Sequence, residues 1–99
     1  MTLTKTDIET LLRAGIEIVE GLLRVEDIKN KVTYEFPLNE IGQLTIKKRF
    51  RFSFKRPNSH ALIVHKWDMS KIEVDVNQVE DQEIKSALKR VNNYFYTES

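Results

Sequence analysis

The chain has no cysteine, which excludes a disulfide framework, a thiolate metal site and a cysteine nucleophile. This absence suits a reducing compartment, and we expect a cytoplasmic protein. Apolar runs are only a few residues long, far short of the roughly 20 that cross a bilayer. No cationic segment leads into an apolar run near the N-terminus. The sequence therefore predicts no membrane span and no signal peptide.

Glycine and proline are also scarce, with three and two copies in 99 residues. The glycines form no phosphate-binding loop, and the serines stand in no recognisable nucleophile motif. No motif therefore points to a cofactor or to a catalytic set. The length is enough for one hydrophobic core and no repeat interrupts it, so residues 1–99 are predicted to form a single domain.

Net charge is small, at +1, but it is unevenly distributed. Residues 41–71 hold eight Lys and Arg against one Asp, a net of +7, whereas residues 1–40 and 72–99 each carry a net of −3. Two explanations fit this distribution. Either the acidic flanks neutralise the basic middle across the folded surface, or the middle forms a basic patch directed at phosphates or at an acidic protein.

The clearest pattern lies between Leu44 and Arg56, where apolar and polar residues alternate. A period of two predicts a strand with one buried and one exposed face. Lys48 is the single break, which we interpret as a bulge or a change of direction. The predicted buried row consists of Leu44, Ile46, Phe50, Phe52 and Phe54. The predicted exposed row consists of Thr45, Lys47, Arg49, Arg51, Ser53 and Lys55.

Helices are predicted at both ends of the chain. Apolar residues recur at helical spacing from about residue 5 to about residue 23, with Thr4 or Thr6 as the N-cap. The segment 16–20 would also fit a short strand, but we adopt the helix. Near the C-terminus a helix is predicted from Asn77, with acids in its first turns. Its apolar stripe, which we assign to the core, consists of Ile84, Ala87, Leu88, Val91 and Phe95.

Three further strands are predicted, over residues 31–36, 60–67 and 71–76, with a turn at 68–70 before the last. Residues 26–31 are read as a polar linker. The short connections favour an antiparallel meander. The predicted fold class is therefore α+β: a four-stranded antiparallel meander with an N-terminal and a C-terminal helix packed on one face, in the order α-β-β-β-β-α.

The hairpin around Pro57 has two possible registers, and a slip of one residue exchanges the two faces of a strand. A four-residue loop pairs Phe52 with Ile63 and turns Trp67 toward the core. A three-residue loop from Pro57 pairs Phe52 with Val64 and turns Trp67 outward. We favour the three-residue loop, because proline keeps the residue before it extended.

The favoured register predicts a basic sheet face with an aromatic contribution. Arg49 and Arg51 would lie beside His65 and Trp67, an arrangement that stacks unpaired bases and grips phosphates in several modules. The alternative is that the arginines pair with acidic residues and that Trp67 packs at an edge. The predicted partner-binding residues are Lys47, Arg49, Arg51, Lys55, Arg56, His65 and Trp67.

Two kinds of chemistry are conceivable for the histidines. His60, His65 and Asp68 offer metal ligands, but the two histidines have opposite strand parity, so no metal site is predicted. His65 with Arg49 and Arg51 could supply acid/base and phosphate-stabilising groups for RNA cleavage. Small ribonuclease toxins have this size and mix of elements, although nothing here matches their residue patterns.

The sequence thus favours a small non-enzymatic binding module that acts through its basic sheet face on nucleic acid or on an acidic protein surface. In size and in its lack of motifs it resembles small proteins of phages and mobile elements, including inhibitors of defence enzymes, but the likeness rests on no specific residues. We expect an inhibitor of a nucleic-acid-handling, defence-type complex. The alternative is an RNA- or single-stranded-DNA-binding domain, or a small ribonuclease toxin. No cofactor, metal or membrane is expected, and a homodimer is compatible with the sequence.

Overall fold

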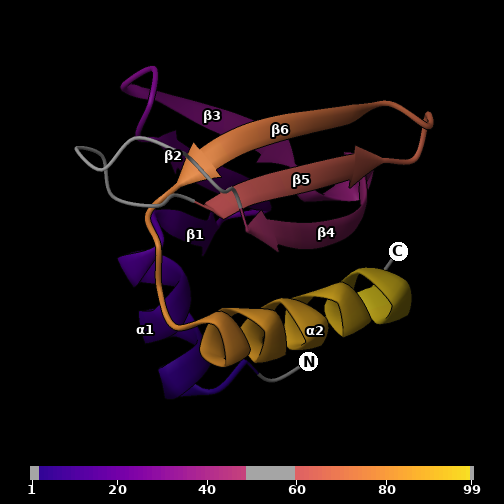
Figure 1. Cartoon of the computed structure of the whole chain (residues 1–99). Helices are drawn as coiled ribbons and strands as arrows, with labels where there is room; N and C mark the ends of the chain where they lie inside the picture. Colours follow the sequence, from indigo (N-terminus) through magenta and orange to yellow (C-terminus); the bar gives the residue numbers. More distant parts are fainter. Residues whose placement is uncertain (1–2, 49–59, 99) are drawn as a thin grey trace.

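The computed structural model describes residues 3–48 and 60–98, which contain two helices and six strands (Figure 1). The predicted α+β class is confirmed. In chain order the elements are α1 (Lys5–Arg13), β1 (Ile16–Val19), β2 (Leu22–Asp27), β3 (Val32–Pro37), a 3₁₀ turn η1 (Leu38–Glu40), β4 (Ile41–Lys48), β5 (His60–Lys66), β6 (Lys71–Val76) and α2 (Asp81–Glu98).

The strands form two three-stranded antiparallel sheets: sheet A, in the order β1-β2-β3, and sheet B, in the order β4-β5-β6. The predicted single four-stranded meander is therefore wrong. The helices also do not share one sheet face, because α1 contacts β1 and α2 while α2 packs on β4. The two sheets meet where β2 lies against β6, and there the Ile28 N–H donates a hydrogen bond to the Asp75 C=O at 2.9 Å.

The predicted helix over residues 5–23 is correct only as far as Arg13. Gly15 adopts a φ of +83°, which suits glycine and turns the chain out of the helix into β1. The start of the helix agrees with one of the two predicted caps. The Thr4 hydroxyl accepts a hydrogen bond from the Asp7 N–H, and the Asp7 carboxylate accepts one from the Thr4 N–H, both at 3.1 Å.

The remainder of the predicted first helix is a β-hairpin. Glu20 and Gly21 have φ values of +50° and +77°, as a two-residue type I′ turn requires. They join β1 to β2, so the strand alternative for residues 16–20 describes the chain better than the helix does. The predicted linker over 26–31 is wrong at its start, because β2 continues to Asp27.

The strands predicted on either side of the Leu44–Arg56 stretch are confirmed as β3, β5 and β6, each within one residue at either end. The turn between β5 and β6 lies one residue earlier than predicted. The Lys66 N–H donates a hydrogen bond to the Ser70 C=O at 2.9 Å, and Met69 between them has a φ of +73°.

The register between β4 and β5 differs from both predicted loops. Val64 lies opposite Leu44 rather than opposite Phe52, eight positions further along the sequence. Because this shift is even, each β5 residue keeps the face that the favoured register gave it. Leu62 and Val64 are accordingly buried, and Trp67 is exposed.

The described pairing of β4 with β5 extends as far as Lys48, which lies opposite His60, and residues 49–59 follow in the sequence. These residues lie outside the part of the chain that the structure describes. They include the later half of the predicted central strand and three members of its predicted buried row, Phe50, Phe52 and Phe54.

The C-terminal helix is confirmed as α2, but it begins at Asp81 rather than at Asn77. The Glu80 carboxylate accepts a hydrogen bond from the Glu83 N–H at 2.9 Å, which satisfies one amide of the first turn. The predicted stripe of this helix is buried, as expected, at Ile84, Ala87, Leu88, Val91 and Phe95.

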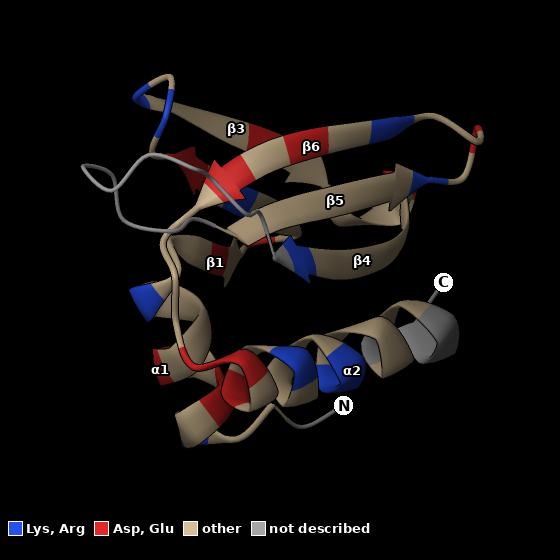
Figure 2. Cartoon of the chain, in the orientation of Figure 1, with Lys and Arg blue, Asp and Glu red and all other residues tan. Residues whose placement is uncertain are grey.

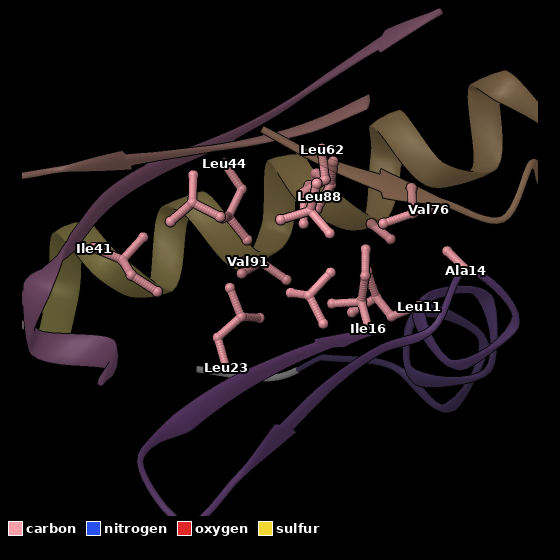
Figure 3. Packing of buried hydrophobic residues seen from close by; sticks show 14 of the residues in the cluster. Leu11, Ala14, Ile16, Leu23, Ile41, Leu44, Leu62, Val76, Leu88 and Val91 are labelled. Atoms are coloured by element: carbon pink, nitrogen blue, oxygen red, sulfur yellow. The ribbon is translucent and has the colours of Figure 1, made fainter. Parts of the chain in front are cut away.

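One hydrophobic core lies between the two sheets and is bounded by α2 (Figure 3). Leu23 of sheet A and Leu62 of sheet B are fully buried in this core. Val91 of α2 belongs to the same cluster of buried side chains. Leu11 of α1 lies next to Ile16 at the end of this core (Figure 3).

The outer edge of β4 is covered by a side chain of α2. The Asn92 side chain accepts a hydrogen bond from the Leu44 N–H at 2.8 Å and donates one to the Leu44 C=O at 2.9 Å. A neighbouring strand would make the same pair of bonds. Asn92 therefore satisfies the main chain of β4 at this point.

Helix α1 is held against α2 by charged side chains. Asp7 is almost fully buried and receives two hydrogen bonds from the Arg90 guanidinium. These bonds hold the pKa of Asp7 at about 2, below its ordinary value of 3.8, although burial acts in the opposite direction. A second ion pair joins Arg13 to Glu83 at 3.0 Å.

Candidate functional site

The predicted binding face corresponds to the outer face of sheet B, and the structure describes only part of it. Lys47, His65 and Trp67 lie in the described residues, on β4, on β5 and just after β5. The other four predicted contacts, Arg49, Arg51, Lys55 and Arg56, lie in residues 49–59, outside the described residues.

Trp67 is the large aromatic side chain on this face, and it is 53% exposed. The main-chain N–H of Trp67 donates a hydrogen bond to the Glu40 C=O at 3.1 Å, which connects the β5–β6 turn to η1. One side of its ring lies over Gly42, where an added Cβ would be 3.4 Å from the indole Cε3. The indole therefore packs on Gly42 with one side of its ring and is open to solvent elsewhere.

Charged groups surround Trp67 at the turn. Lys66 Nζ lies 3.8 Å from Glu40 Oε2 and 6.0 Å from the centre of the Phe36 ring. A shallow cavity of about 290 Å³ is lined by Asn39, Glu40, Lys66, Trp67 and Asp68. The Ser70 N–H and hydroxyl donate to the Asp68 carboxylate, which lowers the pKa of Asp68. Anionic and cationic side chains are thus mixed around the indole.

His65 is half-buried on the same face. Its Nε2 lies 3.0 Å from the Thr45 hydroxyl on β4, and Lys71 lies opposite it on β6. A threonine hydroxyl can orient an imidazole, but at neutral pH it is neither an acid nor a base. Among the residues that the structure describes, this contact does not build an acid/base pair for RNA cleavage.

Lys47 is separated from this group. It lies opposite Ala61, four residues from His65 along β5, which corresponds to about 13 Å. On the other side of β5, the exposed Glu73 of β6 lies opposite Ile63, and the buried Asp75 lies opposite Ala61. Figure 2 accordingly shows basic residues at the end of β4 and near the β5–β6 turn, with acidic residues on β6. The described part of this face carries charges of both signs.

The two histidines lie on opposite faces of β5, as their parity predicted. His60 is buried on the inner side, with Nε2 at 3.8 Å from Asp81 Oδ1. His65 is on the outer side. Within residues 3–48 and 60–98, no three His, Cys, Asp or Glu side chains are placed to share a metal ion.

A second surface feature, absent from our predictions, is an apolar groove of about 610 Å³ between α1 and β1. Ile8 and Leu12 on its helical wall are 47% and 50% exposed. They belong to the apolar spacing that predicted the long helix over residues 5–23. The groove is lined by Leu3, Ile8, Leu11, Leu12, Ile16, Glu17, Ile18 and Val19.

Comparison with known proteins adds no assignment: no family model, no curated protein and no solved structure matches the chain. Neither of the described helices is long and apolar enough to cross a membrane.

Proposed function

We propose that the protein is a small non-enzymatic binding module that docks on a partner protein through the outer face of sheet B, with Trp67 as the central contact. The observation that carries the proposal is the half-exposed indole, supported on one side by Gly42 and open on the other. Exposed tryptophans held in a fixed position are typical energetic centres of protein interfaces.

A protein partner agrees better with the described charges than nucleic acid does. Phosphate binding favours an uninterrupted basic surface, whereas the exposed Glu73 lies on this face opposite Ile63, two positions from His65 along β5. Lys66 and Lys71 near Trp67 favour an acidic rim on the partner. An inhibitor of a nucleic-acid-handling complex is the finer form of this proposal, because such work requires a docking surface and no catalytic set.

The test is co-purification from the native host with three baits: the wild-type protein, Trp67→Ala and Met69→Ala. Met69 is a matched control, because it is 92% exposed in the same turn. We expect a specific protein to be recovered with the wild type and with Met69→Ala, and to be lost with Trp67→Ala. Recovery of the same protein with all three baits would contradict the role of Trp67.

The same preparations separate the alternatives. If RNA or single-stranded DNA is recovered and its binding falls steeply with added salt, the nucleic-acid-binding alternative replaces the proposal. Cleavage of labelled RNA that disappears in His65→Ala would establish the ribonuclease alternative. We expect neither the steep salt dependence nor the cleavage.

A further inference from the structure

The apolar groove runs along the edge of β1. Four successive residues, 16–19, line it together with α1. Successive side chains of a strand point to opposite faces, so side chains of one face alone cannot give four lining residues in a row. The lining therefore includes the edge of the strand itself, where its main-chain groups lie. Sheet A has β1 at one end of its strand order.

The pairing of β1 with β2 shows which main-chain groups face the groove. The Glu26 N–H donates to the Gly15 C=O at 2.9 Å, and the register continues with Glu17 opposite Arg24. In an antiparallel ladder, bonded and non-bonded positions alternate. The N–H and C=O groups of Ile16 and Ile18 therefore point away from β2, toward the groove.

The helical wall of the groove is fixed in place. Ile8 and Leu12 lie on the flank of α1 that faces β1. On the other flank, Asp7 is bonded to Arg90 and Arg13 to Glu83, which anchor α1 to α2. The groove is thus preformed: one wall offers apolar side chains, and the other offers a strand edge whose outward main-chain groups bond no residue that the structure describes.

We propose that this groove binds an extended segment of a partner protein, which adds to the edge of β1 as a fourth strand of sheet A. Strand addition of this kind uses main-chain hydrogen bonds for affinity and alternate side chains for specificity. The apolar side chains of the segment would continue the inner row of Ile16 and Ile18 and pack against Leu12. This site is separate from the face that carries Trp67.

Charge on the outer face of sheet A identifies the other side chains of the segment. Glu17, Arg24 and Glu35 lie opposite one another on β1, β2 and β3, so the sign alternates across the sheet. A basic residue beside Glu17 continues that alternation, and opposite charges on neighbouring strands attract. The bound segment therefore alternates apolar residues with Lys or Arg.

A second copy of the chain fits this edge poorly. In a two-fold arrangement the same edge would pair with itself. The longest overlap through the outward N–H and C=O groups pairs Ile16 with Ile18 of the second copy. This pairing places Glu17 directly opposite Glu17 of the second copy. Like charges at directly opposed positions are destabilising. Charge complementarity therefore favours a basic partner segment over self-association.

The probe is a fluorescent peptide of about eight residues, the length of an ordinary strand, with isoleucine and lysine in alternation. We expect saturable binding in a fluorescence-polarisation titration, and binding weaker by about tenfold or more for the same peptide with glutamate in place of lysine. Glu17→Lys should reverse this preference. An unchanged preference in Glu17→Lys would overturn the assigned charge pattern.

Three protein variants locate the site. Leu12→Ser should weaken binding by about tenfold, whereas Val32→Ser should leave it unchanged, because Val32 is 45% exposed on β3, away from the groove. Trp67→Ala should also leave it unchanged. Equal weakening by Leu12→Ser and Val32→Ser would show that the peptide binds elsewhere.

Two N-methylated peptides test the strand geometry. One carries methyl groups on all the lysine amides and the other on all the isoleucine amides. Only one of these two sets faces β1 in an added strand, so one peptide should bind like the parent and the other should fail. Equal behaviour of the two would exclude strand addition. A homodimer in sedimentation experiments that is dissociated by Leu12→Ser would replace the proposal with self-association.

Discussion

The edges of β4 and β1 both carry main-chain N–H and C=O groups without a neighbouring strand in the described part of the chain, but the two edges differ in how these groups are covered. At β4 the Asn92 side chain bonds both main-chain groups of Leu44. At β1 the corresponding groups of Ile16 and Ile18 point into an apolar groove. Exposed edges invite pairing with other chains, and proteins commonly cover them. Within the described residues, one edge is thus covered by a single side chain, and the other lies uncovered beside apolar surface.

Helix length accounts for part of this difference. Helix α2, over Asp81–Glu98, is twice as long as α1, over Lys5–Arg13, and reaches along β4. Helix α1 ends at Arg13, and Gly15 turns the chain directly into β1. Its flank toward the edge carries the half-exposed Ile8 and Leu12. The short helix therefore forms the wall of a groove, whereas the long one forms a cover.

The largest expected effect on stability concerns the hydrophobic core that the two sheets share. Leu23→Ala in sheet A and Leu62→Ala in sheet B should each lower the free energy of unfolding by about 2–5 kcal/mol, because both side chains are fully buried in the same core. Urea unfolding followed by circular dichroism and by Trp67 fluorescence should give coincident transitions in both variants. Separate transitions for the two probes would show that the sheets do not unfold as one unit.

The next effect concerns the anchor of α1. Asp7→Ala removes a buried carboxylate and leaves half-exposed Arg90 without it, which should cost about 2–3 kcal/mol. Exposed Glu9 on the same helix is the control, and Glu9→Ala should change the free energy of unfolding by less than about 0.5 kcal/mol. Equal effects of the two changes would contradict the anchoring role of Asp7.

The same ion pair predicts a pH dependence. The pKa of Asp7 is about 2 in the folded protein, below its ordinary value of 3.8. Its contribution to stability is therefore complete above about pH 4 and is lost as the pH falls through the folded pKa. The difference in unfolding free energy between the wild type and Asp7→Ala should narrow from pH 4 to pH 2. A difference that stays constant over this range would contradict the assignment.

Opening the covered edge should have a smaller effect on stability. Asn92→Ala leaves the N–H and C=O of Leu44 without their partner, at a cost of about 1–3 kcal/mol. The variant should also self-associate more than the wild type in sedimentation experiments, because an edge has been uncovered. Lys89→Ala, an exposed change on the same helix, should do neither. A monomeric Asn92→Ala of wild-type stability would remove the basis of the comparison.

The smallest effect on stability is expected at the groove. Leu12→Ser and Glu17→Lys alter partly or fully exposed side chains and should each change the free energy of unfolding by less than about 0.5 kcal/mol. Thermal unfolding under the same conditions as the peptide titrations measures this directly. A loss comparable to that of the core variants would show that Leu12 belongs to the core.

Periodicity predicted the faces of the strands better than their partners. Alternation together with the favoured loop places Leu62 and Val64 inside and Trp67 outside, and the structure agrees with these faces. An alternating pattern looks the same after any even shift, however, so it could not distinguish Phe52 from Leu44 as the partner of Val64. The sequence therefore indicated the face of β5 but not its register.

The N-terminal half was harder to predict because its apolar residues satisfy two periods at once. Ile16, Val19 and Leu23 fit a helix, and Ile16 and Ile18 also fit a strand. The positive φ angles at Gly15 and Gly21 determine that the chain forms a hairpin here, and the spacing of apolar residues does not reveal them. The groove was missed for the same reason.

The candidate site was predicted only in part. The exposure of Trp67 was predicted by the favoured loop, whose register differs from the observed one by an even shift. The support of Trp67 by Gly42 and Glu40 depends on contacts between residues far apart in the sequence. The edge pairing of Asn92 with Leu44 is equally non-local, at a separation of 48 residues. Such contacts depend on the tertiary arrangement, which the local pattern does not encode.

The most direct test of the contrast between the two edges is amide hydrogen exchange measured by NMR on the free protein and on the protein with the isoleucine–lysine peptide. The amides of Ile16 and Ile18 should exchange much faster than that of Leu44, which is bonded to Asn92. Addition of the peptide should slow exchange at Ile16 and Ile18 and leave Leu44 unchanged. Slow exchange at Ile16 and Ile18 in the free protein, or no slowing with bound peptide, would contradict the account.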